Sequence, residues 1–297
     1  VNKIQNGSIM MLENIRFNQG EESNDSEFSK KLSDLADIYV NDAFSCSHRS
    51  HASIEGITKY IPSYFGLQIT QEIEALKKIT SEIKKPVTLI IGGSKISTKI
   101  NIINNLAKKF NNIIIVGGMA NTMLKHTGSK VGKSICENDC GSSINEILYI
   151  SKKFDCKITC PIDVVVSKSI EGVGESKDIK EINDDEIILD IGLKTISLIK
   201  KIINDSNTVL WNGPAGYFEN PSFQTGTKEI LEIISQKTIN DKIFSVAGGG
   251  ETVAAINKFN KLDSFTFVST AGGAFLEYLE GKTLPGIKAL NQNVWIK

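Results

Sequence analysis

Glycine clusters at the ends of short β-forming runs are the feature that most constrains the fold of this chain. Five clusters occur, four of them directly after such a run: Gly92-Gly93, Gly117-Gly118, Gly213 with Gly216, Gly248-Gly249-Gly250 and Gly272-Gly273. Short apolar runs bounded by glycine and followed by helix-period sequence predict buried parallel strands with βα turns. In open α/β sheets the ligand binds outside the carboxyl ends of the strands, where glycine lets the backbone approach a phosphate. We therefore expect an α/β fold that binds a phosphorylated ligand.

The runs predict five strands of one parallel sheet, at Val87–Ile91, Ile113–Val116, Thr208–Trp211, Ile243–Ala247 and Phe265–Thr270. With 297 residues the chain is long enough for two domains. We expect a partial N-terminal domain over 1–65, a connecting hinge helix over 66–84, a self-sufficient C-terminal domain over 85–281 and a tail over 282–297. In the first 65 residues we expect strands at Ile9–Leu12 and Ile38–Asn41 and a helix at about Asp25–Ala36.

Charge is balanced, with 34 basic and 34 acidic side chains. A balanced chain has no global field that favours nucleic acid or a membrane surface, so neither is expected as a partner. No apolar run approaches the roughly 20 residues of a membrane span, and the N-terminus does not resemble a signal peptide. We expect a cytoplasmic protein that holds any anionic substrate with a local cluster of charges.

Only two of the basic residues are arginine, Arg16 and Arg49. The planar guanidinium suits phosphate and carboxylate better than the point charge of lysine. Each arginine alone would more often be an ordinary surface residue. Both, however, follow predicted strands of the same small sheet, and His48 precedes Arg49, which favours an anion site formed by these side chains.

Lysines flank a predicted helix start after the first glycine cluster. Lys95 lies just before that helix and Lys99 in its first turn, with Ser97 as the expected cap. Lysine at a helix N-terminus opposes the macrodipole, and a bound anion would offset this cost. A chance placement among many lysines is an equally good explanation from sequence alone.

Two carboxylates are candidates on weaker grounds. Glu251 follows three glycines at a strand end, where a hard oxygen ligand suits Mg²⁺ bound to phosphates. An acidic residue favoured by the helix dipole explains it as well. Glu219 lies in a loop long enough to reach a ribose, although a solvated loop acid is the commoner case.

Three apparent motifs are rejected. Residues 128–134 resemble the phosphate loop G-x4-G-K-[ST], but they are one residue short and follow a helix. Gly172-Val-Gly174 fails the dinucleotide pattern. The C-x3-C pair Cys156/Cys160 lies in a strand stretch broken by Pro161, where four residues span about 13 Å, too far for one metal. Reduced thiols are expected instead.

With these residues placed, the chain closely resembles the phosphoglycerate kinase family. The matching segments are 12–17 (LENIRF), 39–44 (YVNDAF), 48–51 (HRSH), 92–99 (GGSKISTK), 117–120 (GGMA), 161–166 (PIDVVV), 211–214 (WNGP), 248–252 (GGGET) and 276–281 (LEYLEG). They run in order over almost the whole chain.

The resemblance implies two doubly wound, Rossmann-like domains facing across a cleft, in a monomer that transfers a phosphoryl group reversibly between ATP and 3-phosphoglycerate. It implies that Arg16, Arg49 and His48 bind the phosphoglycerate and that Lys95, Gly250 and Gly273 are catalytic. The implied nucleotide-binding residues are Lys99, Gly117, Gly118, Asn212, Glu219, Gly248, Gly249, Gly250, Glu251, Thr252 and Gly272, with Glu251 near Mg²⁺.

The chain departs from the family pattern in three places. Glu251 stands where the family usually has aspartate, and Ala271 stands where a third glycine is common. The family's N-terminal stretch, which carries further substrate-binding residues, is absent, so the first domain is expected to be incomplete. A truncated nucleotide-binding fragment without turnover is therefore the alternative function. A dinucleotide-dependent oxidoreductase is a second alternative, which the lack of G-x-G-x-x-G disfavours.

Overall fold

The computed structural model describes residues 4–292 of the chain, which divide into two compact units. Unit 1 takes the residues up to Glu74 together with those from Lys282 on, and unit 2 is Ala75–Gly281. Helix α3 (Leu67–Thr80), within the range expected for the connecting helix, runs from unit 1 into unit 2. Among the described residues, no helix has the length and apolar character needed to cross a membrane.

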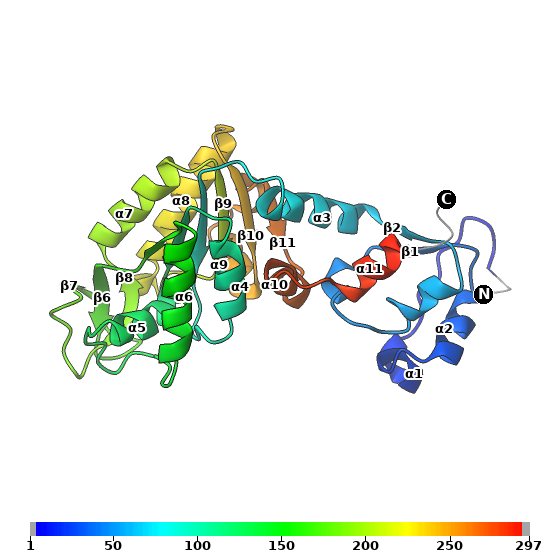
Figure 1. Cartoon of the computed structure of the whole chain (residues 1–297), viewed down its shortest axis with the longest axis horizontal. Helices are drawn as coiled ribbons and strands as arrows, with labels where there is room; N and C mark the ends of the chain where they lie inside the picture. Colours follow the sequence, from blue (N-terminus) through cyan, green and yellow to red (C-terminus); the bar gives the residue numbers. More distant parts are fainter. Residues whose placement is uncertain (1–3, 293–297) are drawn as a thin grey trace. The chain divides into compact units, whose positions relative to one another are not determined.

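Unit 2 is built on a six-stranded sheet in the order β11-β10-β9-β3-β4-β5, in which every neighbouring pair is parallel. The strands are β3 (Val87–Ile91), β4 (Asn112–Ile115), β5 (Lys157–Thr159), β9 (Thr208–Asn212), β10 (Phe244–Gly248) and β11 (Phe267–Ser269). All five predicted strands are present; β3 has the predicted bounds, and the ends of the other four differ by at most two residues. Strands β9, β10 and β11 run side by side in Figure 1.

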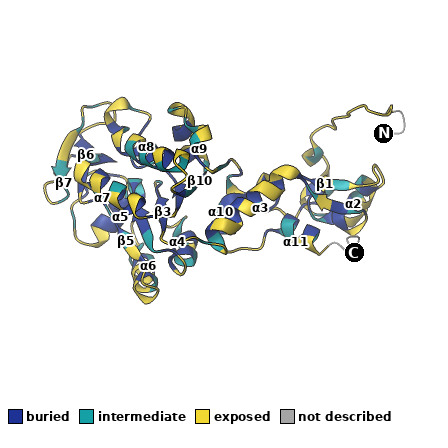
Figure 2. Ribbon diagram, turned by 90° about the horizontal axis from the view of Figure 1, so that it is seen from above, coloured by how far each residue is buried: buried dark blue, intermediate teal, exposed yellow. Residues whose placement is uncertain are grey.

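Helices cover both faces of this sheet, as expected of a doubly wound fold. They are α4 (Ile100–Ala107), α5 (Gly117–His126), α6 (Gly141–Lys153), α7 (Leu193–Asn204), α8 (Thr225–Ile239), α9 (Gly250–Lys258) and α10 (Gly273–Leu279), with short 3-10 turns η4 (Pro221–Phe223) and η5 (Leu262–Ser264). Ile90 and Trp211 pack against residues of α7 and α8 in one buried cluster. Their neighbours Leu89 and Ile91 are fully buried on the opposite face. In Figure 2 the central strand β3 is buried, while α7 and α8 expose their outer sides.

A second sheet in unit 2 was not expected from the sequence. It is antiparallel, with the order β7-β6-β8, and consists of β6 (Asp163–Ser167), β7 (Glu175–Asp178) and β8 (Ile187–Ile191). The stretch around Pro161 does break as predicted, since β5 ends before it and β6 starts after it. Strand β8 also contacts α5 and α8, which places this small sheet beside the large one.

Unit 1 holds a two-stranded parallel sheet and short helices. Its elements are η1 (Ile15–Phe17), α1 (Gln19–Glu22), α2 (Ser26–Ser33), β1 (Tyr39–Asn41), η2 (Phe44–Cys46), η3 (Gly56–Lys59), β2 (Ser63–Phe65) and α11 (Pro285–Asn291). Helix α11 joins this unit from the C-terminal tail, where the Gly286 N–H donates to the Ser47 carbonyl at 2.9 Å. Residues 293–297 of the expected tail lie outside the described residues.

The strand expected at Ile9–Leu12 is wrong. These residues pair with no strand of the described chain, and Ile9 and Met11 are almost fully exposed. Hydrophobic composition alone does not make a strand, because a strand also needs a neighbouring edge for its backbone groups. Strand β1 pairs only with β2. Arg16 consequently lies in η1, where its backbone N–H donates to the Asn14 side chain at 3.1 Å.

Candidate functional site: two adjoining cavities at the reversal of strand order

The strand order of the large sheet reverses between β3 and β9. From β3 the chain adds β4 and β5 on one side, then returns to add β9, β10 and β11 on the other. The chain therefore leaves β3 and β9 toward opposite halves of the sheet, from neighbouring carboxyl ends. Ligands of open α/β sheets bind at such a position.

Glycine allows these two loops to touch. The Gly92 N–H donates to the Asn212 carbonyl at 2.8 Å. Gly213 has φ of +100°, and a Cβ there would lie 2.5 Å from the Gly92 carbonyl. Any side chain at Gly213 would force the loops apart, so the glycine after β9 is required by this contact.

A lysine-lined cavity of about 260 Å³ lies between the loops. Its walls are Gly92, Gly93, Ser94, Lys95, Thr98, Lys99, Asn212, Gly213, Gly249, Gly250, Glu251, Thr252 and Leu276. Gly249, with φ of +95°, caps the N-terminus of α9, so the free backbone N–H groups of that helix face this region. The combination of two lysines and a helix N-terminus suits an anion.

Lys99 is the half-buried cation of the cavity. Its ammonium donates to the Asn212 Oδ1 at 2.7 Å, and the Asn212 amide donates to the Gly248 carbonyl at 2.6 Å. Burial lowers the pKa of Lys99, against the nearby carboxylates of Glu251 and Glu280, which raise it. An arriving phosphate would favour the charged form of this ammonium and gain a short, charge-assisted hydrogen bond. Lys95, in contrast, is exposed.

Ser97 does not cap α4 as expected. The helix begins at Ile100 with Lys99 as its N-cap, and no side chain forms the cap hydrogen bond. Ser97 instead directs both its N–H and its hydroxyl to Glu137. Ser97 was expected as the cap because serine favours that position. In the structure, the carboxylate of Glu137 from another segment binds this serine instead.

A larger, mainly apolar cavity of about 510 Å³ adjoins the first. The two share Gly93, Ser94 and Glu251. The walls of the larger one include Gly117, Gly118, Ala120, Pro161, Ile187, Ile188, Leu189, Asp190, Ile191, Pro214, Tyr217 and Glu219. A flat apolar group can occupy this space while a charged tail reaches the lysines, which is the shape of a nucleotide.

Three of the expected site residues of unit 2 line neither cavity. Gly248 is inside β10, where a Cβ would collide with the ring of Phe275. Gly272 and Gly273 stand at the start of α10, which contributes Leu276 to the lysine-lined cavity. The other expected nucleotide-site residues of unit 2, and Lys95, all line one cavity or both.

Strand β8 and the segment 128–134 supply cavity residues that were not predicted from the sequence. Asp190 is 2% exposed and accepts hydrogen bonds from the backbone N–H groups of Ile191 and Gly226, at 2.9 and 2.7 Å. Burial raises its pKa to about 7, although both hydrogen bonds act in the opposite direction. Lys133, from the segment rejected as a phosphate loop, also lines the apolar cavity. An aspartate inside an apolar strand was the available signal for Asp190.

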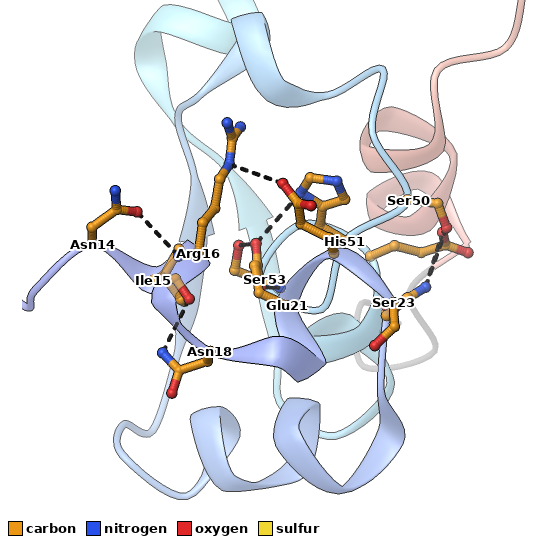
Figure 3. Close-up of polar contacts among 12 residues, drawn as sticks. Asn14, Ile15, Arg16, Asn18, Glu21, Ser23, Ser50, His51 and Ser53 are labelled. Carbon is orange, nitrogen blue, oxygen red and sulfur yellow. Dashed lines mark hydrogen bonds and ion pairs between the residues drawn. The ribbon is translucent and has the colours of Figure 1, made fainter.

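In unit 1, Arg16 lies in η1 (Figure 3), whereas His48 and Arg49 lie together just after η2. The Arg16 Nε is 4.0 Å from the Glu22 carboxylate. Arg49 follows η2 and is exposed, and the Nδ1 of His48 is buried without a hydrogen-bond partner among the described residues. No hydrogen bond or ion pair within residues 4–292 joins Arg16 to Arg49. Both side chains are thus available to a ligand, but the structure does not bring them into contact.

The turn that carries Arg49 is tied to α1. The buried carboxylate of Glu21 accepts from the Ser53 N–H and hydroxyl at 2.9 and 2.5 Å, and it lies 3.6 Å from His51 Nδ1 (Figure 3). The backbone of the same residue accepts from the Ala52 N–H at 2.9 Å. These contacts fix the end of the loop that begins after β1.

Comparison with known proteins gives consistent matches. The family model described as phosphoglycerate kinase matches residues 1–282. The phosphoglycerate kinases of Chelativorans sp. and Caulobacter vibrioides are 45% and 46% identical over 294 and 292 residues, which cover 98% of this chain and 74% of each relative. The phosphoglycerate kinase structure from Coxiella burnetii superposes with a TM-score of 0.90 at 39% identity, covering 94% of this chain and 72% of that one. That from Pyrococcus horikoshii gives 0.82 at 29%, covering 97% and 74%.

The matches agree with the site in two respects. They extend over both units of the chain, and the resemblance in fold includes the parallel sheet whose strand reversal forms the cavities. This chain belongs to the phosphoglycerate kinase family.

Proposed function

We propose that the chain transfers a phosphoryl group reversibly between ATP and the carboxylate of 3-phosphoglycerate, giving ADP and 1,3-bisphosphoglycerate. The observation that carries this function is the lysine-lined cavity that opens directly into an apolar one at the β3/β9 reversal. A nucleotide has the matching division into an apolar base and a charged phosphate chain. The matches to phosphoglycerate kinases name the reaction.

The adenine is proposed to occupy the apolar cavity against Gly117 and Gly118, with Glu219 reaching the ribose. The phosphates would lie among Lys99, Asn212 and residues 249–252, where the first N–H groups of α9 are free to donate. The roles of Gly248, Gly272 and Gly273 stay predictions, because these residues line neither cavity.

A magnesium ion fits this site through Glu251. Its carboxylate lines both cavities, at the point where they join. In the described residues no group of three or more histidine, cysteine, aspartate or glutamate side chains gathers around a metal position. One carboxylate together with substrate phosphates is, however, how Mg²⁺ is usually held in phosphoryl-transfer sites. When bound, the ion would neutralise phosphate charge.

The protein's own part in the reaction is positioning and charge stabilisation. As the bond from the terminal phosphorus to ADP breaks and the bond to the carboxylate oxygen forms, negative charge spreads over the transferring oxygens. Lys95 is proposed to stabilise that charge, with Gly250 offering backbone N–H donation. In unit 1, Arg16, Arg49 and His48 would bind 3-phosphoglycerate. Closure of the two domains about the 66–84 helix would bring both substrates together, in a cytoplasmic monomer.

Two measurements on the purified chain test this function. The first is calorimetric titration with Mg-ADP, and the second is formation of 1,3-bisphosphoglycerate from ATP and 3-phosphoglycerate in a coupled assay. Binding with turnover supports the kinase. Binding without turnover favours the alternative of a nucleotide-binding fragment. Binding of NADH in place of Mg-ADP would contradict both.

A further inference from the structure

The loop that carries Lys95 and Lys99 is held by a residue outside it. Between β3 and α4 the chain runs through residues 92–99, and α4 lacks a side-chain cap of its own. The Ser97 N–H donates to the Glu137 Oε2 at 2.9 Å, and the Ser97 hydroxyl donates to the Glu137 Oε1 at 2.5 Å. Glu137 therefore supplies, from 40 residues further along the chain, the acceptors that the loop lacks.

The segment around Glu137 is itself anchored to α5. The Glu137 N–H donates to the Thr122 hydroxyl at 3.1 Å, and the Asn121 amide donates to the Ile135 carbonyl at the same distance. The Lys125 ammonium adds a contact to Asn138 at 3.2 Å. Because α5 starts at the glycines that line the apolar cavity, Glu137 connects one wall of the nucleotide site to the loop 92–99.

The carboxylate of Glu137 is stabilised in its charged form. Partial burial would raise its pKa, but hydrogen bonds from Ser97 and the Ile96 backbone, together with the nearby charge of Lys95, hold that pKa below its ordinary value. Both hydrogen bonds to Ser97 are thus charge-assisted at neutral pH, which makes them shorter and stronger than neutral ones.

We propose that Glu137 is a positioning residue for phosphoryl transfer, which fixes Ser97 and thereby the loop that presents Lys95 and Lys99 to the nucleotide phosphates. The inference rests on the proposed function of the two cavities. Without Glu137 the loop would lose two hydrogen bonds and be less ordered before the ligand binds. Ordering its two lysines would then cost part of the binding free energy. The apolar cavity, whose walls come from other elements, would be little changed.

Glu137→Ala, Glu137→Gln and the control Glu146→Ala test this role by titration with Mg-ADP and with adenosine. Glu146 is an exposed glutamate on α6. Glu137→Ala should weaken Mg-ADP binding about tenfold, as expected for loss of charge-assisted hydrogen bonds, and leave adenosine binding unchanged. Glu137→Gln keeps one acceptor oxygen and should lose less. The control should bind both ligands like the wild type.

Amide hydrogen exchange without ligand gives an independent measurement. Peptides that cover residues 92–99 should exchange faster in Glu137→Ala than in the wild type or the Glu146→Ala control. Unchanged exchange in these peptides would overturn the link between Glu137 and the loop, even if the wild type failed to bind Mg-ADP and the proposed function were wrong. Equal losses of Mg-ADP and adenosine affinity would mean that Glu137 only stabilises the fold.

Discussion

At the scale of single residues, the two lysines of the loop 92–99 have different environments and should have different roles. Lys99 is half-buried and bonded to Asn212, whereas Lys95 is exposed. Lys95 is proposed to stabilise the negative charge that develops during transfer. Lys95→Ala should therefore lower kcat by about 10²–10³, or roughly 2.7–4 kcal/mol, as for loss of one preorganised charge stabiliser. Steady-state kinetics with saturating ATP and 3-phosphoglycerate measures this.

Lys99→Ala is the matched comparison. It should weaken Mg-ADP binding more than Lys95→Ala does, because its ammonium lies inside the cavity before any transfer. A Lys95→Ala variant with wild-type kcat, or one whose main defect is in nucleotide affinity, would refute the assignment of Lys95.

Arg49 should distinguish the two substrates. Arg49→Lys keeps the charge but loses the planar fork that binds phosphate or carboxylate with two hydrogen bonds. We expect 3-phosphoglycerate affinity to fall about tenfold, the cost of one charge-assisted bond, while Mg-ADP affinity is retained. Calorimetry with each ligand separately checks this, and parallel losses for both would place Arg49 outside the substrate site.

Asp190 should make stability depend on pH. Its pKa is about 7 in the folded protein and 3.8 in a model compound. Below pH 3.8, Asp190 is protonated in both the folded and the unfolded state. Above pH 3.8 the unfolded chain releases this proton first, so the free energy of unfolding should fall as the pH rises toward 7 and then level off. Asp190→Asn has a similar shape and cannot ionise. Urea titrations at about pH 5 and pH 8 give the unfolding free energies of both proteins. From pH 5 to pH 8 the wild type should lose stability relative to Asp190→Asn. A constant difference would contradict the raised pKa.

At the scale of elements, the contact between the β3 and β9 loops is sensitive to a single methyl group. Gly213→Ala combines a positive φ with a collision against the Gly92 backbone, and it should destabilise the protein by about 1–3 kcal/mol. Gly128→Ala is the control, because Gly128 has φ of +89° and nothing within 4 Å of its missing Cβ. If urea unfolding gave equal losses for both variants, the loop contact would have no energetic role.

The five predicted strands of the large sheet could be found because each is a short apolar run with glycine at its end or within a few residues of it. The antiparallel β6–β8 sheet was not predicted, because strand formation depends on the tertiary context of each segment. Helix α11 has a local signal that was overlooked, a proline at its first position. Asp190 and Glu137 act through contacts 36 and 40 residues away along the chain, which sequence spacing does not encode.

At the scale of the whole molecule, the candidate residues divide between the two units. Arg16, Arg49 and His48 lie in unit 1, and both cavities lie in unit 2, which builds its own core on the six-stranded sheet. This division predicts that each substrate is recognised by one unit. Nucleotide binding should therefore stabilise unit 2 by mass action, independently of 3-phosphoglycerate.

Titration of the chain with Mg-ADP, combined with thermal unfolding, tests whether a nucleotide binds at the β3/β9 reversal. We expect saturable binding at one site. At 100-fold excess over Kd, binding should stabilise unit 2 by about 2.7 kcal/mol and raise its melting temperature by several degrees, and Lys99→Ala should lose most of this effect. Lys228→Ala, an exposed lysine on α8 that lines neither cavity, should behave like the wild type. Wild-type binding in Lys99→Ala, or no binding by the unaltered chain, would contradict a nucleotide site at the β3/β9 reversal.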